Sequence, residues 1–353
     1  MVKDRIRGCI VGGAIGDAFG YPVEFMSLET ITAKYGEEGI TDYDMSNHWL
    51  GERSQKALFS DDTQMTLYTI EGLNQAVKKG TGLVPMICNA YVAWYGGQAG
   101  KRVKISYKSE LSGIKELNQR RAPGTTCMSS LEAIYRGKEP KNNSKGCGGV
   151  MRVAPIGCYG VLRGWELAET AKIAGEVAEL THQHLLSTYS SAALAVIVQQ
   201  CLLADSMSRE KFEAIVEKSL QIVEDLYKIE AKDDAVMENP PDFESFKTLI
   251  SLALEMQGFV DIPDSHIIEN KLGEGWMAEE ALAIAVYSVL RHIDDFTACM
   301  VCAVNHGGDS DSTGAIAGNI LGAIMGYGRL PKNLADGIQL KDLLIRMADS
   351  LGA

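Results

Sequence analysis

The stretch NHGGDSDSTGAIAGNILGAIMG, residues 305–326, joins a polar, glycine-rich segment to a run of small apolar residues. In its second half, glycines recur every four residues, at Gly314, Gly318, Gly322 and Gly326. Residues at this spacing share one face of an α-helix, so the helix would present a nearly smooth strip of backbone. Each glycine inside a helix costs about 1 kcal/mol relative to alanine. The pattern therefore predicts that another segment packs very closely on this face.

A second glycine stripe of the same kind lies near the start of the chain, at Gly8, Gly12, Gly16 and Gly20. We expect the two stripes to pack on each other, or on a neighbouring helix, in the middle of the protein. Packing on each other would bring the two ends of the chain together. The alternative is that some of these glycines form turns.

Apolar residues at three- and four-residue spacing dominate the rest of the chain and predict a protein built from helices. The predicted helical segments are residues 61–79, 83–96, 128–136, 165–180, 186–204, 209–228, 243–257, 277–290, 294–304, 312–326 and 340–350. The best strand signal, RVKISY at 102–107, is also compatible with a loop. The charged segment 227–245 is predicted to be a surface loop within one domain, because composition does not shift across it. We therefore predict a single large all-α domain, residues 1–353, folded as an orthogonal bundle of many helices.

Composition excludes several classes of function. Thirty-four basic and 46 acidic residues give a net charge of -12, which argues against a nucleic-acid or anionic membrane surface. No stretch approaches 18 consecutive apolar residues, and the N-terminus is glycine-rich and interrupted by Asp17, so neither a membrane span nor a signal peptide is expected. Eight scattered cysteines lie mostly in apolar surroundings, which is typical of thiols in a reducing compartment. The CxxC pair, Cys299 and Cys302, is expected to be two buried thiols, with a metal or redox pair as the alternative. These features predict a cytoplasmic protein, and a monomer is the default expectation.

Two acidic motifs precede predicted helices at opposite ends of the chain. They supply Ser60, Asp61, Asp62, Asp309, Asp311 and Ser312. Helix capping explains either motif alone. If the two ends of the chain meet, however, four carboxylates converge and repel one another. A divalent cation removes that conflict, and an all-oxygen ligand set favours Mg²⁺, Mn²⁺ or Ca²⁺ over zinc. An EF-hand is excluded, because Ile320 stands where that loop requires a bidentate glutamate.

Other segments could complete a site around such a cation. Glu24, in GDAFGYPVEF with Asp17, is an ordinary surface glutamate unless it lies beside the metal, where it becomes a candidate general base. The glycine-centred loops 120–127 and 142–157 are either plain structural loops or leave backbone N–H groups free to bind an anion. Cys147 is not expected to be a nucleophile, because no spacing marks a base for it.

Taken in order, the motifs GAIGDAFGYPVEF, FSDDTQM, GCGGVMRVAPIG, THQH and NHGGDSDSTGAIAGNILGAI resemble the ADP-ribosylglycohydrolases. This family comprises the dinitrogen-reductase-activating glycohydrolases and the ADP-ribosylhydrolases. The resemblance runs from about residue 6 to about residue 330. It implies an all-α domain with two divalent cations, Mg²⁺ or Mn²⁺, at the centre of a cleft. It also implies that the six residues of the two acidic motifs bind these cations and that the protein removes ADP-ribose from modified side chains.

The resemblance also assigns residues around the metals. Glu24 corresponds to a glutamate near the metals and the scissile bond, and either Glu24 or a metal-bound water would activate the attacking water. The residues implied to bind substrate are Thr125, Ser144, Lys145, Gly146, Cys147, Gly148 and His182. Two features depart from the family pattern. Ser60 and Ser312 stand where threonine is frequent, and Cys147 stands where asparagine is common.

The expected partners are an ADP-ribosylated protein as substrate and ADP-ribose as product, with no nucleic acid and no membrane. An N-glycosidic arginine linkage is favoured. The alternatives are another conjugate of ADP-ribose, either serine-linked or a small molecule, and an ADP-ribose-binding protein without catalytic activity.

Overall fold

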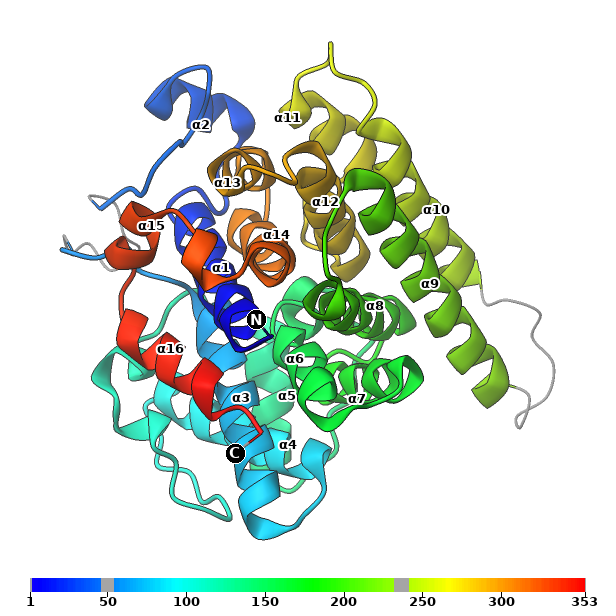
Figure 1. Ribbon diagram of the computed structural model, residues 1–353. Coiled ribbons are helices and arrows are strands. Elements are labelled where there is room, and N and C mark those ends of the chain that lie inside the picture. Colours follow the sequence, from blue (N-terminus) through cyan, green and yellow to red (C-terminus); the bar gives the residue numbers. More distant parts are fainter. Residues whose placement is uncertain (1, 46–53, 232–240, 353) are drawn as a thin grey trace.

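The computed structural model describes residues 2–45, 54–231 and 241–352 of the chain. These residues form helices joined by loops, and the only β-type pairing among them is two isolated bridges (Figure 1). The helices are α1 (Val2–Gly20), α2 (Leu28–Tyr35), α3 (Asp61–Lys79), α4 (Leu83–Gln98), α5 (Thr125–Tyr135), α6 (Ala154–Arg163), α7 (Leu167–Glu179), α8 (Leu185–Leu203), α9 (Arg209–Ala231), α10 (Pro241–Met256), α11 (Asp264–Ile267), α12 (Ala278–Arg291), α13 (Phe296–Val304), α14 (Ser310–Met325), α15 (Lys332–Gly337) and α16 (Lys341–Ser350). The predicted all-α fold class is confirmed.

The two glycine stripes pack against each other in an antiparallel pair, α1 and α14, near the middle of the molecule (Figure 1). A β-carbon added at Gly12 would lie 2.5 Å from the carbonyl oxygen of Gly318, and Gly16 faces Gly314 in the same way. No side chain fits between backbones this close, which explains the four-residue spacing. Gly326 is the exception among the eight, since it caps α14 with φ +81° and is therefore a turn glycine.

This antiparallel pairing brings the end of α1 next to the start of α14, and a buried carboxylate adds the start of α3. Asp17, one turn before the end of α1, accepts hydrogen bonds from the backbone amides of Ser60 (2.7 Å) and Thr63 (2.9 Å). The Thr63 hydroxyl donates a third, at 2.6 Å. The two acidic motifs, far apart in sequence, therefore meet at one end of the central helix pair.

The remaining core surrounds this pair. Helix α8 is the one described helix that is long and apolar enough to cross a membrane, but 89% of its most apolar window is buried inside the protein, as in a core helix. At the periphery, the Arg7 guanidinium on α1 donates two hydrogen bonds to Asp349 on α16, at 2.6 and 2.7 Å. The first and last helices are thereby joined.

The prediction that residues 227–245 form a loop is wrong at both ends of this segment. Helix α9 continues to Ala231 and α10 begins at Pro241, while residues 232–240 lie outside the described part of the chain. Near residue 228 the charges belong to a helix, where the half-buried Lys228 pairs with the buried Glu224 one turn earlier. Proline is compatible with the first helical position, where its missing N–H costs nothing.

Two smaller expectations concern RVKISY and the CxxC pair. RVKISY forms an irregular connection between α4 and α5 and not a strand. Cys299 and Cys302 are free, buried thiols on α13, as expected.

Candidate functional site

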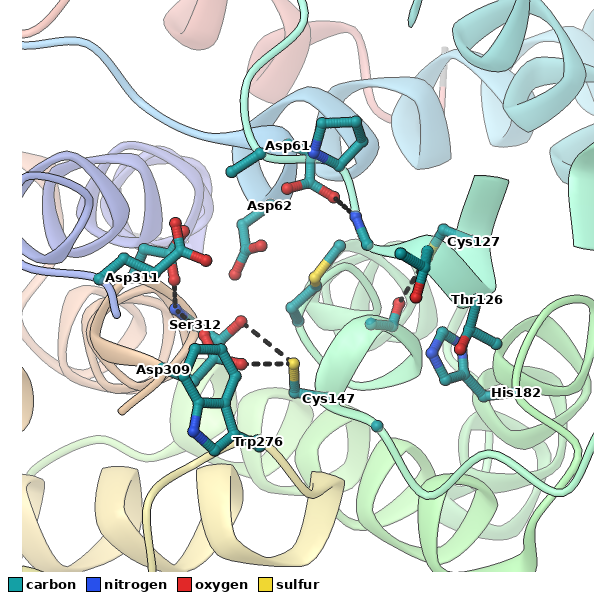
Figure 2. A pocket seen from close by; sticks show the side chains of 18 of the residues that line it. Asp61, Asp62, Thr126, Cys127, Cys147, His182, Trp276, Asp309, Asp311 and Ser312 are labelled. Carbon is teal, nitrogen blue, oxygen red and sulfur yellow. Dashed lines mark hydrogen bonds between the residues drawn. The ribbon is translucent and has the colours of Figure 1, made fainter. Parts of the chain in front are cut away.

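Five carboxylates converge where α1, α3 and α14 meet. Asp61 and Asp62 lie in the first turn of α3, Asp309 caps α14, Asp311 lies in its first turn, and Glu24 follows α1. None of the five is more than 5% exposed. Oxygen atoms of Glu24, Asp309 and Asp311 lie within 4.8 Å of one another. In Figure 2, Asp61 and Asp62 extend from one side toward Asp309 and Asp311 on the other.

Burial and mutual repulsion raise the pKa of these carboxyl groups. Burial is the larger cause for Asp61, Asp62 and Asp309, whose pKa values lie well above the ordinary value, and the charge of Asp311 adds to it. Glu24 shows the same causes in the same order, with its pKa strongly raised. Such an assembly of like charges out of water is unfavourable unless a positive charge or protons compensate it.

The chemistry of the donor set fits a divalent cation. Glu24 Oε2 and Asp62 Oδ2 are buried, and no hydrogen-bond donor among the described residues reaches them. Buried polar atoms in native proteins are almost always satisfied, so two orphan oxygens facing the same cluster indicate a missing partner. An all-oxygen, carboxylate-rich cluster is the environment that Mg²⁺ and Mn²⁺ prefer.

The capping and metal interpretations of the acidic motifs coexist in the structure. Ser60 Oγ accepts a hydrogen bond from the Asp62 amide at 3.2 Å, which starts α3. The Ser312 amide donates to Asp311 Oδ1 at 2.9 Å and to Asp309 Oδ1 at 3.4 Å. Capping uses one oxygen of a side chain and leaves its other lone pairs available. The N-terminal turns of α3 and α14 thus hold the carboxylates in place.

The carboxylates form one side of a cavity of about 320 Å³. On its other side lie the loop before α5, the loop around Cys147, and His182 (Figure 2). Of the predicted substrate-binding residues, five line the cavity: Thr125, Gly146, Cys147, Gly148 and His182. Ser144 and Lys145 are not among the lining residues. The Ser144 hydroxyl lies 3.2 Å from that of Thr126, and Lys145 is exposed.

The loop around Cys147 is pinned to the segment before α12. The Cys147 amide donates to the Trp276 carbonyl at 3.0 Å, and the Ala278 amide donates to the Lys145 carbonyl at 2.8 Å. The Cys147 thiol donates to Asp309 Oδ2 at 2.7 Å, so it links this loop to the carboxylate cluster. Burial, with the charge of Asp309, raises the pKa of Cys147 well above its ordinary value. A protonated thiol is a poor nucleophile. That Cys147 is not a nucleophile stays a prediction.

His182 is held neutral against this loop. Its Nδ1 lies 2.9 Å from the Thr181 hydroxyl, which also accepts a hydrogen bond from Arg152 at 2.6 Å. Burial, and next the charge of Arg152, lower the pKa of His182 to about 3. A β-carbon at Gly148 would lie 2.7 Å from the imidazole Cε1, so glycine lets the loop pass directly over the ring. His184, its neighbour in the THQH motif, caps α8 and does not line the cavity.

Sequence reasoning missed two aromatic residues at the cavity, Phe25 and Trp276. Their rings stack with centroids 5.0 Å apart and an interplanar angle of 21°. Trp276 stands in no recognisable motif. For Phe25 the only available signal was its position directly after Glu24.

A separate group, Asp264, His292 and Cys302, also has potential ligand atoms within 4.8 Å of one another. Here Asp264 Oδ1 already accepts hydrogen bonds from Tyr287 (2.6 Å) and Arg291 (2.9 Å). Oδ2 lies 3.2 Å from His292 Nε2. The neighbouring guanidinium opposes a cation, so this group is an ion-pair network that joins α11 to α12.

Comparison with known proteins agrees with this arrangement. The family model described as ADP-ribosylglycohydrolase matches residues 1–353. ADP-ribosylhydrolase ARH3 of Gallus gallus is 26% identical over 369 residues, covering 98% of this chain and 92% of that protein. ADP-ribosyl-dinitrogen reductase glycohydrolase of Rhodospirillum rubrum is 25% identical over 354 residues, covering 96% and 92%. A solved structure described as an ADP-ribosylglycohydrolase-related protein complex shares the fold, with a TM-score of 0.63 at 22% identity, covering 99% of this chain and 97% of that one.

An all-α fold with a buried carboxylate cluster on one side of a cavity defines a scaffold that could hold a cation. The chain belongs to the ADP-ribosylglycohydrolase family. It is therefore an enzyme of the glycosidase type, acting on ADP-ribosyl bonds.

Proposed function

We propose that this enzyme is a divalent-cation-dependent hydrolase that removes ADP-ribose from a modified protein side chain, with the N-glycosidic arginine linkage favoured. It would thereby reverse mono-ADP-ribosylation. The observation that carries the proposal is the convergence of Glu24 with the carboxylates of two helix N-termini on one side of a single cavity. The names of the relatives in Gallus gallus and Rhodospirillum rubrum support it.

The six residues of the two acidic motifs would hold two cations, Mg²⁺ or Mn²⁺, and these would supply positive charge for binding and orienting the substrate. The opposite wall suits the diphosphate. There, α5 begins at Thr125, and the glycine-rich loop Gly146–Gly148 lines the cavity. The amides of Gly146 and Cys147 already donate to Ser144 Oγ and to the Trp276 carbonyl, so the N-terminus of α5 would be the main source of donors. Helix N-termini and free backbone N–H groups bind phosphate oxygens well, and they do so in a protein whose net charge opposes anions.

The reaction is the displacement of the leaving group by water at the anomeric carbon of the ribose. The water oxygen bonds to that carbon, the bond to the leaving nitrogen or oxygen breaks, and the leaving group gains a proton. The carbon passes through an oxocarbenium-like state. Glu24 would accept the proton of the attacking water; its position beside Asp309 and Asp311 at the cavity supports this role.

The test measures release of free ADP-ribose from two substrates. Both are the same peptide, modified with ADP-ribose on an arginine in one and on a serine in the other. We expect release from the arginine substrate with Mg²⁺, and loss of release with EDTA or in Asp309→Ala. Release from the serine substrate alone would keep the hydrolase function but change its linkage from N-glycosidic arginine to O-linked serine. Tight, metal-dependent binding of ADP-ribose without any release would replace the proposal with a binding protein. Release that is unaffected by EDTA and by Asp309→Ala would show that the metal site is wrong.

Mg²⁺ is expected to raise the melting temperature, and to raise it more at about pH 8 than at about pH 5.5. Without a cation, burial and the charge of Asp311 raise the pKa of Asp17 from 3.8 to about 7, and those of Asp61 and Asp62 rise in the same direction. The folded protein then binds protons more tightly than the unfolded chain. That stabilisation is complete below about pH 4 and is lost as the pH rises through about 7.

A cation that replaces the protons of Asp61 and Asp62, and that offsets the charge of Asp311 near Asp17, therefore stabilises the fold most at a pH where these protons have dissociated. Scanning calorimetry with Mg²⁺ and with EDTA at both pH values measures the difference. An equal shift at both pH values, or the same shift in Asp309→Ala, would contradict binding at these carboxylates.

A further inference from the structure

An aromatic pair stands at the mouth of the cavity. Phe25 is 57% exposed, and its ring stacks on that of Trp276. Both side chains line the same cavity as Glu24 and Asp309. An exposed aromatic side chain that also lines the cavity can contact a bound substrate.

The backbone holds Phe25 there in a conformation that is unfavourable for a residue with a side chain. Its φ is +66°, in the left-handed region. The Phe25 amide donates to the carbonyl of Gly308 at 3.3 Å, and the Asp309 amide donates to the carbonyl of Glu274 at 2.8 Å. Three segments are thereby joined: the one that carries Glu24, the one that carries Asp309 and the one that carries Trp276. Strain of this kind persists at functional sites, where the surrounding structure fixes it.

The position of the pair indicates which part of the substrate it would meet. In the view of Figure 2, Trp276 and His182 lie on opposite sides of Cys147. Under the proposed function, the diphosphate lies toward the His182 side and the scissile bond lies at Glu24. Phe25 follows Glu24 directly in the chain, so the aromatic pair borders the side on which the leaving group departs.

We propose that Phe25 and Trp276 form the leaving-group subsite and that this subsite selects a planar cation, the guanidinium of arginine. The inference rests on the proposed hydrolase function and deepens it. Guanidinium groups stack on aromatic faces, and the attraction strengthens where water is partly excluded. The short, neutral side chain of serine gains no such contact.

The experiment compares kcat/KM for one peptide that carries ADP-ribose on an arginine or on a serine. The variants are Phe25→Leu, Trp276→Leu and Phe25→Tyr, and Phe259→Leu is the control because Phe259 is also exposed but does not line the cavity. In Phe25→Leu and Trp276→Leu, we expect kcat/KM for the arginine peptide to fall about tenfold, with the serine peptide changed less than about twofold. Phe25→Tyr keeps an aromatic face and should stay near the wild type, as should Phe259→Leu.

Three results would overturn the inference. They are an equal fall for both peptides, no fall for either, and a wild-type enzyme that prefers the serine peptide. All three leave the hydrolase itself intact. Failure of the proposed function is distinguishable, because the wild-type enzyme would then release ADP-ribose from neither peptide. Circular dichroism and the Mg²⁺-dependent shift in melting temperature, measured for each variant, separate loss of the subsite from loss of the fold.

Discussion

Glu24→Gln is expected to lower kcat for release of ADP-ribose by about 10²- to 10⁴-fold, the usual contribution of a general base. Glutamine has nearly the same shape and retains one oxygen that can face the cluster. It cannot take a proton from water. Since Glu24 is buried and its Oε2 has no donor among the described residues, the substitution breaks no hydrogen bond of that oxygen.

The matching measurement is cation binding by the same variant. We expect the Mg²⁺-dependent rise in melting temperature to persist in Glu24→Gln and to be lost in Asp309→Ala, which removes a carboxylate from the cluster. If Glu24→Gln turned over at nearly the wild-type rate, Glu24 would not be the base, and activation of water by the cations would be the remaining alternative. If it lost both turnover and the Mg²⁺ response, Glu24 would act chiefly in binding the cations.

Much of this site could be predicted from the sequence, because two regular features set its geometry: the glycine stripes and the acidic motifs that precede helices. The four-residue glycine spacing predicts a close helix pair, and the pairing places both acidic motifs at the same end. Asp17 shows where this reasoning stops. Sequence grouped it with Glu24 as a third acidic site, whereas its three hydrogen bonds show that it anchors α3 to α1. Whether a buried carboxylate receives hydrogen bonds depends on contacts between segments that are distant in sequence, and no local sequence pattern predicts these contacts.

The contact between Phe25 and Trp276 could not be predicted from the sequence for a related reason. Phe25 and Trp276 are more than 250 positions apart in the sequence, and neither belongs to a periodic apolar face. They meet because irregular segments are tied together by single backbone hydrogen bonds, one of them to a residue in a left-handed conformation. Helix α6 was missed because its start lies in a glycine-rich segment with Pro155 in the first turn, which reads locally as a loop.

Gly16→Ala is expected to reduce the free energy of unfolding by about 3 kcal/mol or more, although glycine to alanine inside a helix ordinarily stabilises by about 1 kcal/mol. The added β-carbon would overlap the carbonyl group of Gly314, which belongs to the backbone of α14 and cannot rotate away. The two helices would have to separate along their whole contact, since Gly12 and Gly8 face Gly318 and Gly322 equally closely.

Gly113→Ala is the matched control, because a β-carbon there meets no atom within 4 Å, and it should change stability by less than about 0.5 kcal/mol. Urea unfolding of both variants measures the difference. Asp17, which holds the start of α3, is the residue after Gly16, so helix separation should also weaken the Mg²⁺-dependent rise in melting temperature. A Gly16→Ala protein as stable as the wild type would mean that the glycine faces do not touch. The carboxylates would then need another reason to meet.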